Sequence, residues 1–414
     1  MFNYHTNNLI NSSNCRAVRR HLCHRKPERM QKFQHSYEMY EYNLDYVRWL
    51  ADVCGVDMMV ENYKMNYRTF STLFVITFTI LNACYSCWFY YPNWFKIVEV
   101  LITFSVCLQG ANKFYNAYIH RHFFILMYGR LRNLHFKYRQ HQQNNAQLLL
   151  LMQRIHLISK GIFVLFILGG CSYFVYPIFS YWCCRRRELL FSLRIPWIDA
   201  DSPNGYIITM SFQLCMIIFT VFGMSAADSA ILLFVCSLAG FVDVFKNELN
   251  ELNVMVEEKP RKEQKIREKV REICVQHLTV IEYESDLDER YFTTCFVQVV
   301  SATVGLSSAL FLAYVARYIP GFALMLVLSA QLFEFCLLGT VLYVKNEEIT
   351  EAIYEAKWHL LEKPQQRCIA LMLHKSQNFV EMTVGGLAPL NMETFVAIMK
   401  SIYSYFTMLI SFIE

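Results

Sequence analysis

Hydroxyl side chains follow one side of the last apolar stretch of the chain, residues 395–413. On a helical wheel of about 100° per residue, the polar side chains fall within an arc of roughly 140°. Hydroxyl groups need hydrogen-bond partners that hydrocarbon does not supply, so this arc requires either a neighbouring helix or water. The wheel alone leaves both environments open. The arc contains Thr394, Ala397, Lys400, Ser401, Ser404, Thr407, Met408 and Ser411.

Ionisable side chains also occur inside apolar stretches, where they are functional candidates because burying a charge is costly. Glu334 and Gln331 lie one helical turn apart and form the deepest pair. Asp228 and Glu99 lie near the ends of two other stretches. A hydrogen bond to a neighbouring helix is an equally good explanation for each of them, and their roles stay open at this stage.

A third group combines aromatic, methionine and small side chains in the outward halves of the apolar stretches. Such a lining suits a small apolar ligand that a few polar groups orient, while ordinary core packing is the alternative. These candidate ligand-binding residues are Ser105, Gly170, Tyr173, Tyr176, Met210, Gln213, Phe311 and Tyr314.

No residues are arranged for catalysis. The cluster of His21, Cys23 and His24, and the pair of Cys274 and His277, supply too few ligands for a closed metal site. The chain has neither a glycine-rich phosphate loop nor a nucleophile elbow. We therefore expect no enzyme activity, no cofactor and no metal. The net charge of +5 comes from loops between the apolar stretches, so nucleic-acid binding has no support.

The elements that carry these residues are predicted membrane helices. Of 414 residues 55% are hydrophobic, which is too apolar for an ordinary soluble domain. The fold class is therefore all-α, a seven-transmembrane protein. Seven stretches reach the length of about 20 residues that a bilayer requires. They are 69–91, 97–119, 157–182, 206–235, 291–316, 319–344 and 395–413. Ile319-Pro320-Gly321 suggests a hairpin tip before the sixth stretch.

Positive charge predicts the orientation. Of 39 Lys and Arg residues, 31 lie in segments 1–68, 113–156, 241–290 and 345–392, and the alternate connections hold few. By the positive-inside rule these segments are cytosolic, so the N-terminus is inside and the C-terminus outside. The first 35 residues are polar and basic and lack the apolar run of a signal peptide.

Two cytosolic connections read as helices. In 241–290 apolar residues recur at helical spacing on both sides of Pro260, and Glu263 and Arg267 are spaced to pair across one turn. Residues 348–388 carry two helical stretches around Pro364, closed by Gly385-Gly386. Helices of this length below the membrane imply a cytosolic anchor bundle. The mixed charges of 261–269 are typical of a solvated face, with anionic lipid as the alternative partner.

The C-terminal third resembles the insect odorant receptors. The similarity lies in Ala352-Ile353-Tyr354 with Trp358, in 367–372, in Gly385-Gly386, and in 401–409. Earlier segments, including Ile195-Pro196-Trp197 and 274–277, are also similar to that family.

The resemblance implies a tetrameric, ligand-gated, non-selective cation channel whose pore is lined by the final helix. It places the pore and gate at Ser404, Met408, Ser411 and Phe412, and the odorant pocket in the outer half of the bundle. It also implies a plasma-membrane location in sensory dendrites. The expected partners are a small volatile odorant, monovalent and divalent cations, membrane lipid and shared co-receptor subunits. Which odorant it binds stays open.

The chain then divides into four parts under this interpretation. They are a cytosolic N-terminal segment, 1–68, a six-helix bundle with the pocket, 69–344, a cytosolic anchor segment, 345–392, and a pore-lining helix, 393–414. Ser411 departs from the related gustatory receptors, which have Gln before the final Phe, and this favours an odorant-tuned subunit. A gustatory-type homotetramer stays the alternative. A G-protein-coupled receptor is less favoured because it needs the opposite orientation.

Overall fold

The computed structural model describes residues 33–56, 63–184, 188–315 and 319–411. Within these ranges the regular secondary structure is helical, apart from one isolated antiparallel bridge between Thr383 and Pro389. Turns and loops connect the helices. The main helices are α2 (Ser36–Val53), α3 (Tyr67–Phe89), α4 (Trp94–Ile119), α5 (Arg121–Lys137), α6 (Gln142–Cys184), α7 (Pro203–Glu257), α8 (Glu263–Val315), α9 (Ile319–Glu355), α10 (Lys363–Ser376) and α11 (Met392–Ser411). Two short 3-10 helices are η1 (Tyr138–Gln140) and η2 (Trp358–Leu360).

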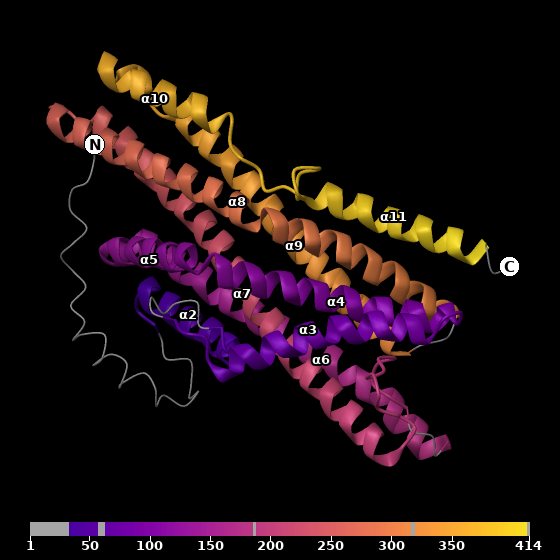
Figure 1. Cartoon of the computed structure of the whole chain (residues 1–414). Coiled ribbons are helices and arrows are strands. Elements are labelled where there is room, and N and C mark those ends of the chain that lie inside the picture. Colours follow the sequence, from indigo (N-terminus) through magenta and orange to yellow (C-terminus); the bar gives the residue numbers. More distant parts are fainter. Residues whose placement is uncertain (1–32, 57–62, 185–187, 316–318, 412–414) are drawn as a thin grey trace.

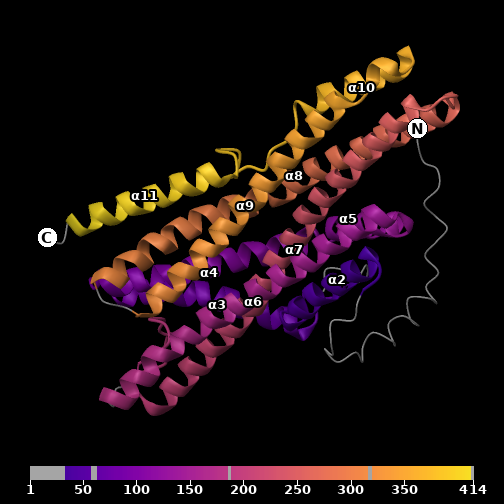
Figure 2. The ribbon, with the colours of Figure 1, turned by 180° about the vertical axis from the view of Figure 1, so that it is seen from behind.

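Six of the described helices are long and apolar enough to cross a membrane: α3, α4, α6, α7, α8 and α9. They coincide with the first six predicted stretches, which confirms the all-α membrane class. The seventh stretch forms α11, which is not one of the six and packs beside α8 and α9. Figures 1 and 2 show α11 running along one side of the molecule, with its C-terminal end far from α10.

Several helix ends agree with the predicted breaks. α7 ends at Glu257 and α8 begins at Glu263, on either side of Pro260. The predicted apolar positions of this region, such as Phe245 and Ile273, are buried. α7 and α8, with 55 and 53 residues, therefore extend well beyond the length of a membrane span.

Three details differ from the expectations. Residues 319–321 open the first turn of α9 rather than forming a tip, because proline is tolerated there. Pro364 likewise lies in the first turn of α10, behind a capping box made by Glu362 and Gln365. Arg267 pairs with Glu362 at 2.9 Å rather than with Glu263.

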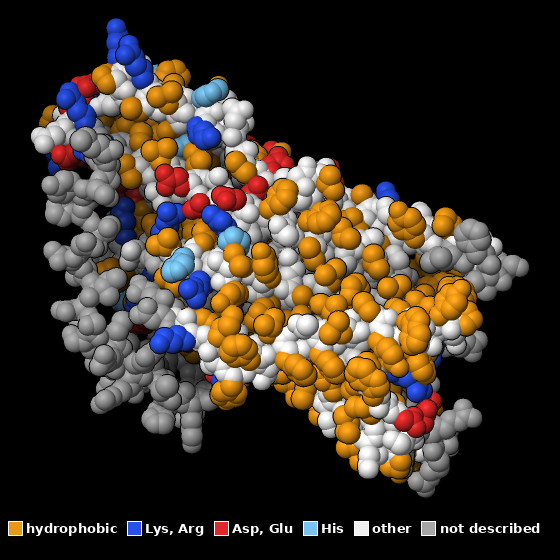
Figure 3. Space-filling model, viewed as in Figure 1, with side chains coloured by type: hydrophobic (Ala, Val, Ile, Leu, Met, Phe, Trp, Pro, Cys, Tyr) orange, Lys and Arg blue, Asp and Glu red, His pale blue; other side chains and the backbone are white. Residues whose placement is uncertain are grey.

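The core centres on α7, in which every residue of 228–235 is buried. α7 packs against α6 and α9, and α8 packs against α4 and α9. Figure 3 shows hydrophobic side chains covering the face over α3 and α4, while charged side chains gather toward α5, α8 and α10. The molecule thus has an apolar end and a charged end along the same bundle.

Candidate functional site

A cavity of about 160 Å³ lies inside the apolar end. Its walls come from α3, α4, α6, α7 and α9, together with the last residues of α2 and the segment that follows it. Most lining side chains are aliphatic or aromatic, such as Val75, Phe166 and Leu328. A cavity of this composition can hold a small apolar molecule by burial and dispersion.

Two adjacent glycines in α6 bring the helices around the cavity together. A Cβ atom on Gly170 would lie 2.9 Å from Cγ2 of Ile217 in α7, and one on Gly169 would lie 2.7 Å from Cγ2 of Val327 in α9. Both glycines line the cavity. Gly170, one of the predicted ligand residues, therefore lies in the cavity wall, where its missing side chain lets α6 approach α7 closely.

Tyr173 also lines the cavity, and its ring lies 4.6 Å from that of Phe191. Phe191 belongs to the segment before α7, and Gln213 holds this segment in place. Gln213 is fully buried and accepts hydrogen bonds from the backbone N–H groups of Leu190 and Phe191 at 3.0 and 3.2 Å. Its amide group donates to the carbonyls of Phe191 and Leu193 at 2.9 and 3.3 Å. Gln213 is thus a support behind the cavity wall and does not line it.

The structure places four other predicted ligand residues outside the cavity. Ser105 is buried, donates to the carbonyl of Ile102 at 2.7 Å, and lies against Gly305 of α8. Met210 packs in the cluster around Phe191. Phe311 is buried beside Trp94. Tyr314 is 60% exposed and contacts Phe406 of α11, with ring centroids 5.6 Å apart. Tyr176 lies in α6, but its side chain is outside the described residues.

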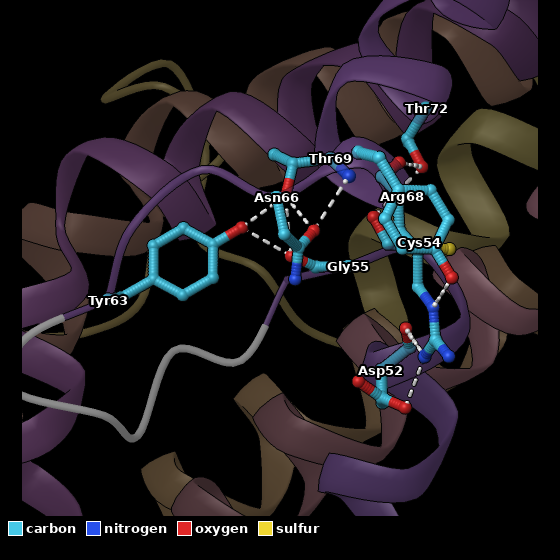
Figure 4. A network of polar contacts seen from close by, with 9 residues as sticks. Asp52, Cys54, Gly55, Tyr63, Asn66, Arg68, Thr69 and Thr72 are labelled. Atoms are coloured by element: carbon cyan, nitrogen blue, oxygen red, sulfur yellow. Dashed lines mark hydrogen bonds and ion pairs between the residues drawn. The ribbon is translucent and has the colours of Figure 1, made fainter.

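The inner wall of the cavity uses the corner between α2 and α3, which includes part of the predicted cytosolic N-terminal segment, 1–68. Gly55 has φ of +70°, and a Cβ atom there would lie 2.5 Å from the amide nitrogen of Thr69. Figure 4 shows the polar contacts that close this corner. Thr69 Oγ1 donates to the carbonyl of Gly55 at 2.8 Å, Thr72 Oγ1 donates to the carbonyl of Cys54 at 2.9 Å, and Arg68 pairs with Asp52 at 2.5 Å. Cys54 and Thr72 line the cavity.

The amphipathic pattern of 36–53 could have revealed this wall. Its buried residues include Met39, Tyr40, Leu44, Val47 and Leu50, which recur at helical spacing. The helix they form packs on α5, α6 and α7. Its modest apolar content, below that of a membrane span, hid its contribution to the site.

Asp228 and Gln331, two of the residues singled out from the sequence, form a buried polar cluster beside the cavity. Lys113 of α4 pairs with Asp228 of α7 at 2.5 Å, and Gln331 of α9 donates to the other carboxylate oxygen of Asp228 at 3.1 Å. Gln331 thus bonds Asp228, while Oε1 of Glu334 is buried without a partner among the described residues. Glu99 pairs instead with Lys96 at 2.8 Å, next to Ser192.

The predicted polar arc of α11 faces away from the bundle. Ile402 is 3% exposed, and Phe395, Ile398 and Met399 pack on the main core, so the opposite side of the helix makes the contacts. Ser404 and Ser411 are exposed, and Met408 is 52% exposed. Phe412 lies outside the described residues.

Comparisons with known proteins agree on one family. A profile described as 7tm Odorant receptor matches residues 93–403. A Drosophila melanogaster protein named odorant receptor 83c is 20% identical over 390 residues, covering 88% of this chain and 96% of that protein. Odorant receptor 10 of Aedes albopictus is 27% identical over 248 residues, covering 57% of this chain and 62% of that protein.

A solved structure shares the fold. The olfactory receptor OR5 of Machilis hrabei, determined in complex with eugenol, superposes with a TM-score of 0.72. The superposition covers 90% of this chain and 99% of that protein, at 11% sequence identity. The arrangement of helices is therefore shared.

Proposed function

This chain belongs to the insect odorant receptor family, and from this premise we propose that it is the odorant-sensing subunit of a heterotetrameric, ligand-gated, non-selective cation channel. The family consists of multi-pass membrane receptors rather than enzymes. In this proposal the chain binds a small volatile molecule and works together with the shared odorant co-receptor. The cavity described above is the proposed odorant site.

The observation that carries the channel proposal is the hydrogen bonding of the α11 hydroxyl groups. Four of them donate within their own helix: Ser401 to the carbonyl of Ala397 at 3.0 Å, Ser404 to that of Lys400 at 3.0 Å, Thr407 to that of Ser404 at 2.9 Å and Ser411 to that of Met408 at 2.8 Å. Their donors are satisfied without a neighbouring helix. Their oxygen lone pairs stay free for water or for a partly hydrated cation, which supports pore lining over helix packing.

The proposed constriction lies in the outer turns of α11. Ser404, Met408 and Ser411 follow one exposed side of the helix, and Phe412 continues it in sequence. Around a fourfold axis, Met408 and Phe412 would narrow the passage with apolar bulk, and apolar constrictions close by dewetting. This segment, 393–414, is the proposed pore helix.

Aromatic contacts connect the cavity to α11. Leu324, Val327 and Leu328 of α9 line the cavity, and Phe333, farther along the same helix, contacts Phe395 of α11 with ring centroids 5.6 Å apart. A ligand that displaces α9 would therefore act on the base of the pore helix. The contact of Tyr314 with Phe406 gives α8 a second connection, nearer the outer end.

The proposed location is the plasma membrane of sensory dendrites, with the N-terminus inside. The anchor segment, 345–392, and the inner parts of α7 and α8 would then form the cytosolic bundle that joins the subunits. A seven-helix G-protein-coupled receptor would need the reverse orientation, and a gustatory-type homotetramer would need no co-receptor.

Patch-clamp recording tests the proposal. Cells express the chain with and without the co-receptor, odorants are applied rapidly, and G-protein signalling is blocked. We expect a fast cation current in the co-expressing cells only. Surface expression without current for a broad odorant panel would refute the channel, and equal currents without the co-receptor would favour the homotetramer.

Variants separate the proposed gate from the proposed pocket. Ser411→Phe and Met408→Ala should change single-channel conductance or ion selectivity, because both positions face the passage. Tyr173→Ala should shift the half-maximal odorant concentration and leave conductance unchanged, because Tyr173 lines the cavity. Equal effects of the two groups of variants on both properties would contradict this separation.

A further inference from the structure

The mostly apolar wall of the cavity contains one strongly polar group of side chains. Among the described lining residues, Lys113 is the one charged side chain and Gln331 the one amide. They come from different helices, α4 and α9, and meet at Asp228 of α7. Asp228 is fully buried behind them and does not line the cavity.

Asp228 orients both donors and leaves each with unused capacity. Its Oδ1 accepts one bond from the Lys113 ammonium and its Oδ2 accepts one from the Gln331 amide, at 2.5 and 3.1 Å. An ammonium has three N–H donors and a primary amide has two. The bonds described use one of each, so both groups can still donate to a molecule in the cavity.

The hydroxyl groups of the inner wall are less able to bind a ligand. Thr72 and Thr79 both line the cavity, but their hydroxyl hydrogens are engaged by the backbone carbonyls of Cys54 and Val75 at 2.9 and 2.7 Å. Lys113 is the strongest donor among the described lining residues, because hydrogen bonds from charged groups in low dielectric are the strong ones. Gln331 donates to the same carboxylate as Lys113, so its amide lies beside the ammonium.

We propose that this cavity selects small, neutral molecules that carry one hydrogen-bond-accepting oxygen, held by Lys113 and Gln331, over hydrocarbons and amines of the same shape. The inference rests on the proposed function and deepens it by naming the ligand class. The remainder of the molecule would occupy the apolar part of the cavity, beside Gly170 and Tyr173.

Charge excludes the two ionic alternatives. A cationic amine would meet the Lys113 ammonium first, because Asp228 lies behind it. A carboxylate ligand would meet an ammonium whose charge Asp228 already neutralises. The buried carboxyl group of Glu334, one turn from Gln331, adds no donor that could stabilise it. Each ion would lose its hydration without meeting a free counter-charge, because neither Asp228 nor Glu334 lines the cavity. A carbonyl or hydroxyl oxygen accepts the available donors at a much lower desolvation cost.

Volume limits the size of the ligand. A cavity of about 160 Å³ is close to one that holds benzene, so ligands of roughly six to ten non-hydrogen atoms fit. Cyclohexanone, methylenecyclohexane and cyclohexylamine share one ring skeleton and differ only at the group that would reach Lys113. They are the matched probes for this site.

The test measures binding and current separately. Thermal melting of the purified full-length chain with each probe reports binding, and patch-clamp recording from cells that co-express the co-receptor reports gating. We expect cyclohexanone to act at a concentration about tenfold lower than methylenecyclohexane, the factor that one such hydrogen bond supplies. Cyclohexylamine, protonated at neutral pH, should bind most weakly.

Variants assign the preference to the polar cluster. Lys113→Met alone would leave Asp228 as an unpaired buried charge, so the double variant Lys113→Met with Asp228→Leu removes both charges. It should lose most of the preference for cyclohexanone over methylenecyclohexane, and the preference that stays belongs to Gln331, which this variant keeps. Gln331→Met keeps the ion pair and should reduce the preference partly. The matched control is Gln109→Leu with Gln298→Leu, a buried α4–α8 pair at 3.4 Å outside the cavity lining, which should keep the full preference.

Three outcomes overturn the inference. They are equal binding of the ketone and the hydrocarbon by the unaltered chain, an unchanged preference in both cavity variants, and failure to bind any of the three probes. Melting that shows the preference without any odorant-evoked current would uphold the ligand class and refute the channel. Currents evoked by other odorants, together with melting that shows no preference for the ketone, would uphold the channel and refute the ligand class.

Discussion

At the residue scale, buried amides in this bundle serve different purposes at similar burial. Gln331 faces the cavity, whereas Gln213 uses both ends of its amide on the backbone of 190–193. We expect Gln213→Leu to leave buried N–H and C=O groups without partners, which costs about 1–3 kcal/mol for each group that stays unsatisfied. The melting temperature of the purified chain should fall clearly. Ile207→Ala, at a side chain that is 61% exposed on the same helix, is the control and should change it little. An unchanged melting temperature for Gln213→Leu would contradict this support role.

His135 of α5 offers a second prediction at this scale. Its side chain is fully buried, stacks on Tyr40 with ring centroids 4.9 Å apart, and has no hydrogen-bond partner among the described residues. Burial lowers its pKa from 6.5 to about 3. The folded imidazole thus stays neutral while the unfolded one takes up a proton. Its contribution to stability is complete above the unfolded pKa and is lost as pH falls from about 6.5 toward 3.

The expected loss from His135 is about 1.4 kcal/mol at a pH one unit below the unfolded pKa. Melting temperatures of the unaltered chain and of His135→Phe, measured between about pH 7.5 and 5.5, isolate this contribution. The variant keeps an aromatic ring but cannot titrate, so its stability should depend less on pH. Other buried histidines act equally in both proteins, so the difference between the two carries the test. Parallel pH profiles would refute the assignment.

At the scale of elements, the segment before α11 is fixed to two helices. A Cβ atom on Gly339 of α9 would lie 1.8 Å from the carbonyl oxygen of Leu390, so the segment crosses α9 in direct backbone contact. The amide of Met392 donates to Thr340 Oγ1 at 3.0 Å, and the amide of Thr383 donates to Asp288 of α8 at 3.2 Å. The start of the pore helix therefore follows any movement of α9.

Gly339→Ala should push this segment away from α9. Overpacking of this kind costs about 1–3 kcal/mol, and the displaced start of α11 should lower the odorant-evoked current per receptor at the surface. The control is Gly161→Ala in α6, where an added Cβ atom meets nothing within 4 Å. Helix propensity alone would make that change neutral or slightly stabilising. Equal currents per surface receptor in the two variants would show that the contact does not matter for gating.

Local sequence signals predicted the elements well and their contacts less well. Length and periodicity placed the first six spans, and Pro260 marked a true break, because these signals depend on the backbone and on burial. The partner of Arg267 was missed, since Glu362 lies far away in the sequence and only folding brings it close. Of the predicted ligand residues, Gly170 and Tyr173 line the cavity, and their role in binding stays a prediction. Lys113 was missed as a site residue, because its pairing with Asp228 depends on how α4 and α7 pack.

At the scale of the whole molecule, apolar and charged regions lie at opposite ends of one bundle. At the charged end, α7 and α9 are joined by ion pairs, including Lys246 with Glu348 at 2.9 Å and Lys345 with Asp243 at 2.6 Å. Helix segments that carry many charged side chains are found in water rather than in lipid, because burying charge in hydrocarbon is costly. Together with the excess of Lys and Arg in alternate connections, this supports a cytosolic location for the charged end.

Epitope tags test this orientation. The C-terminal end of α11 lies at the end of the bundle away from α10, so the proposed topology puts a tag after Glu414 outside the cell and a tag before Met1 inside. Antibody should label the first in intact cells and the second only after permeabilisation. Asn11, in the sequon Asn11-Ser12-Ser13, should carry no glycan. The opposite labelling, or a glycan on Asn11, would place the basic connections outside. The pore proposal needs the constriction of α11 at the outer surface, so this result would contradict it. The proposal for the ligand cavity does not depend on the orientation and would be unaffected.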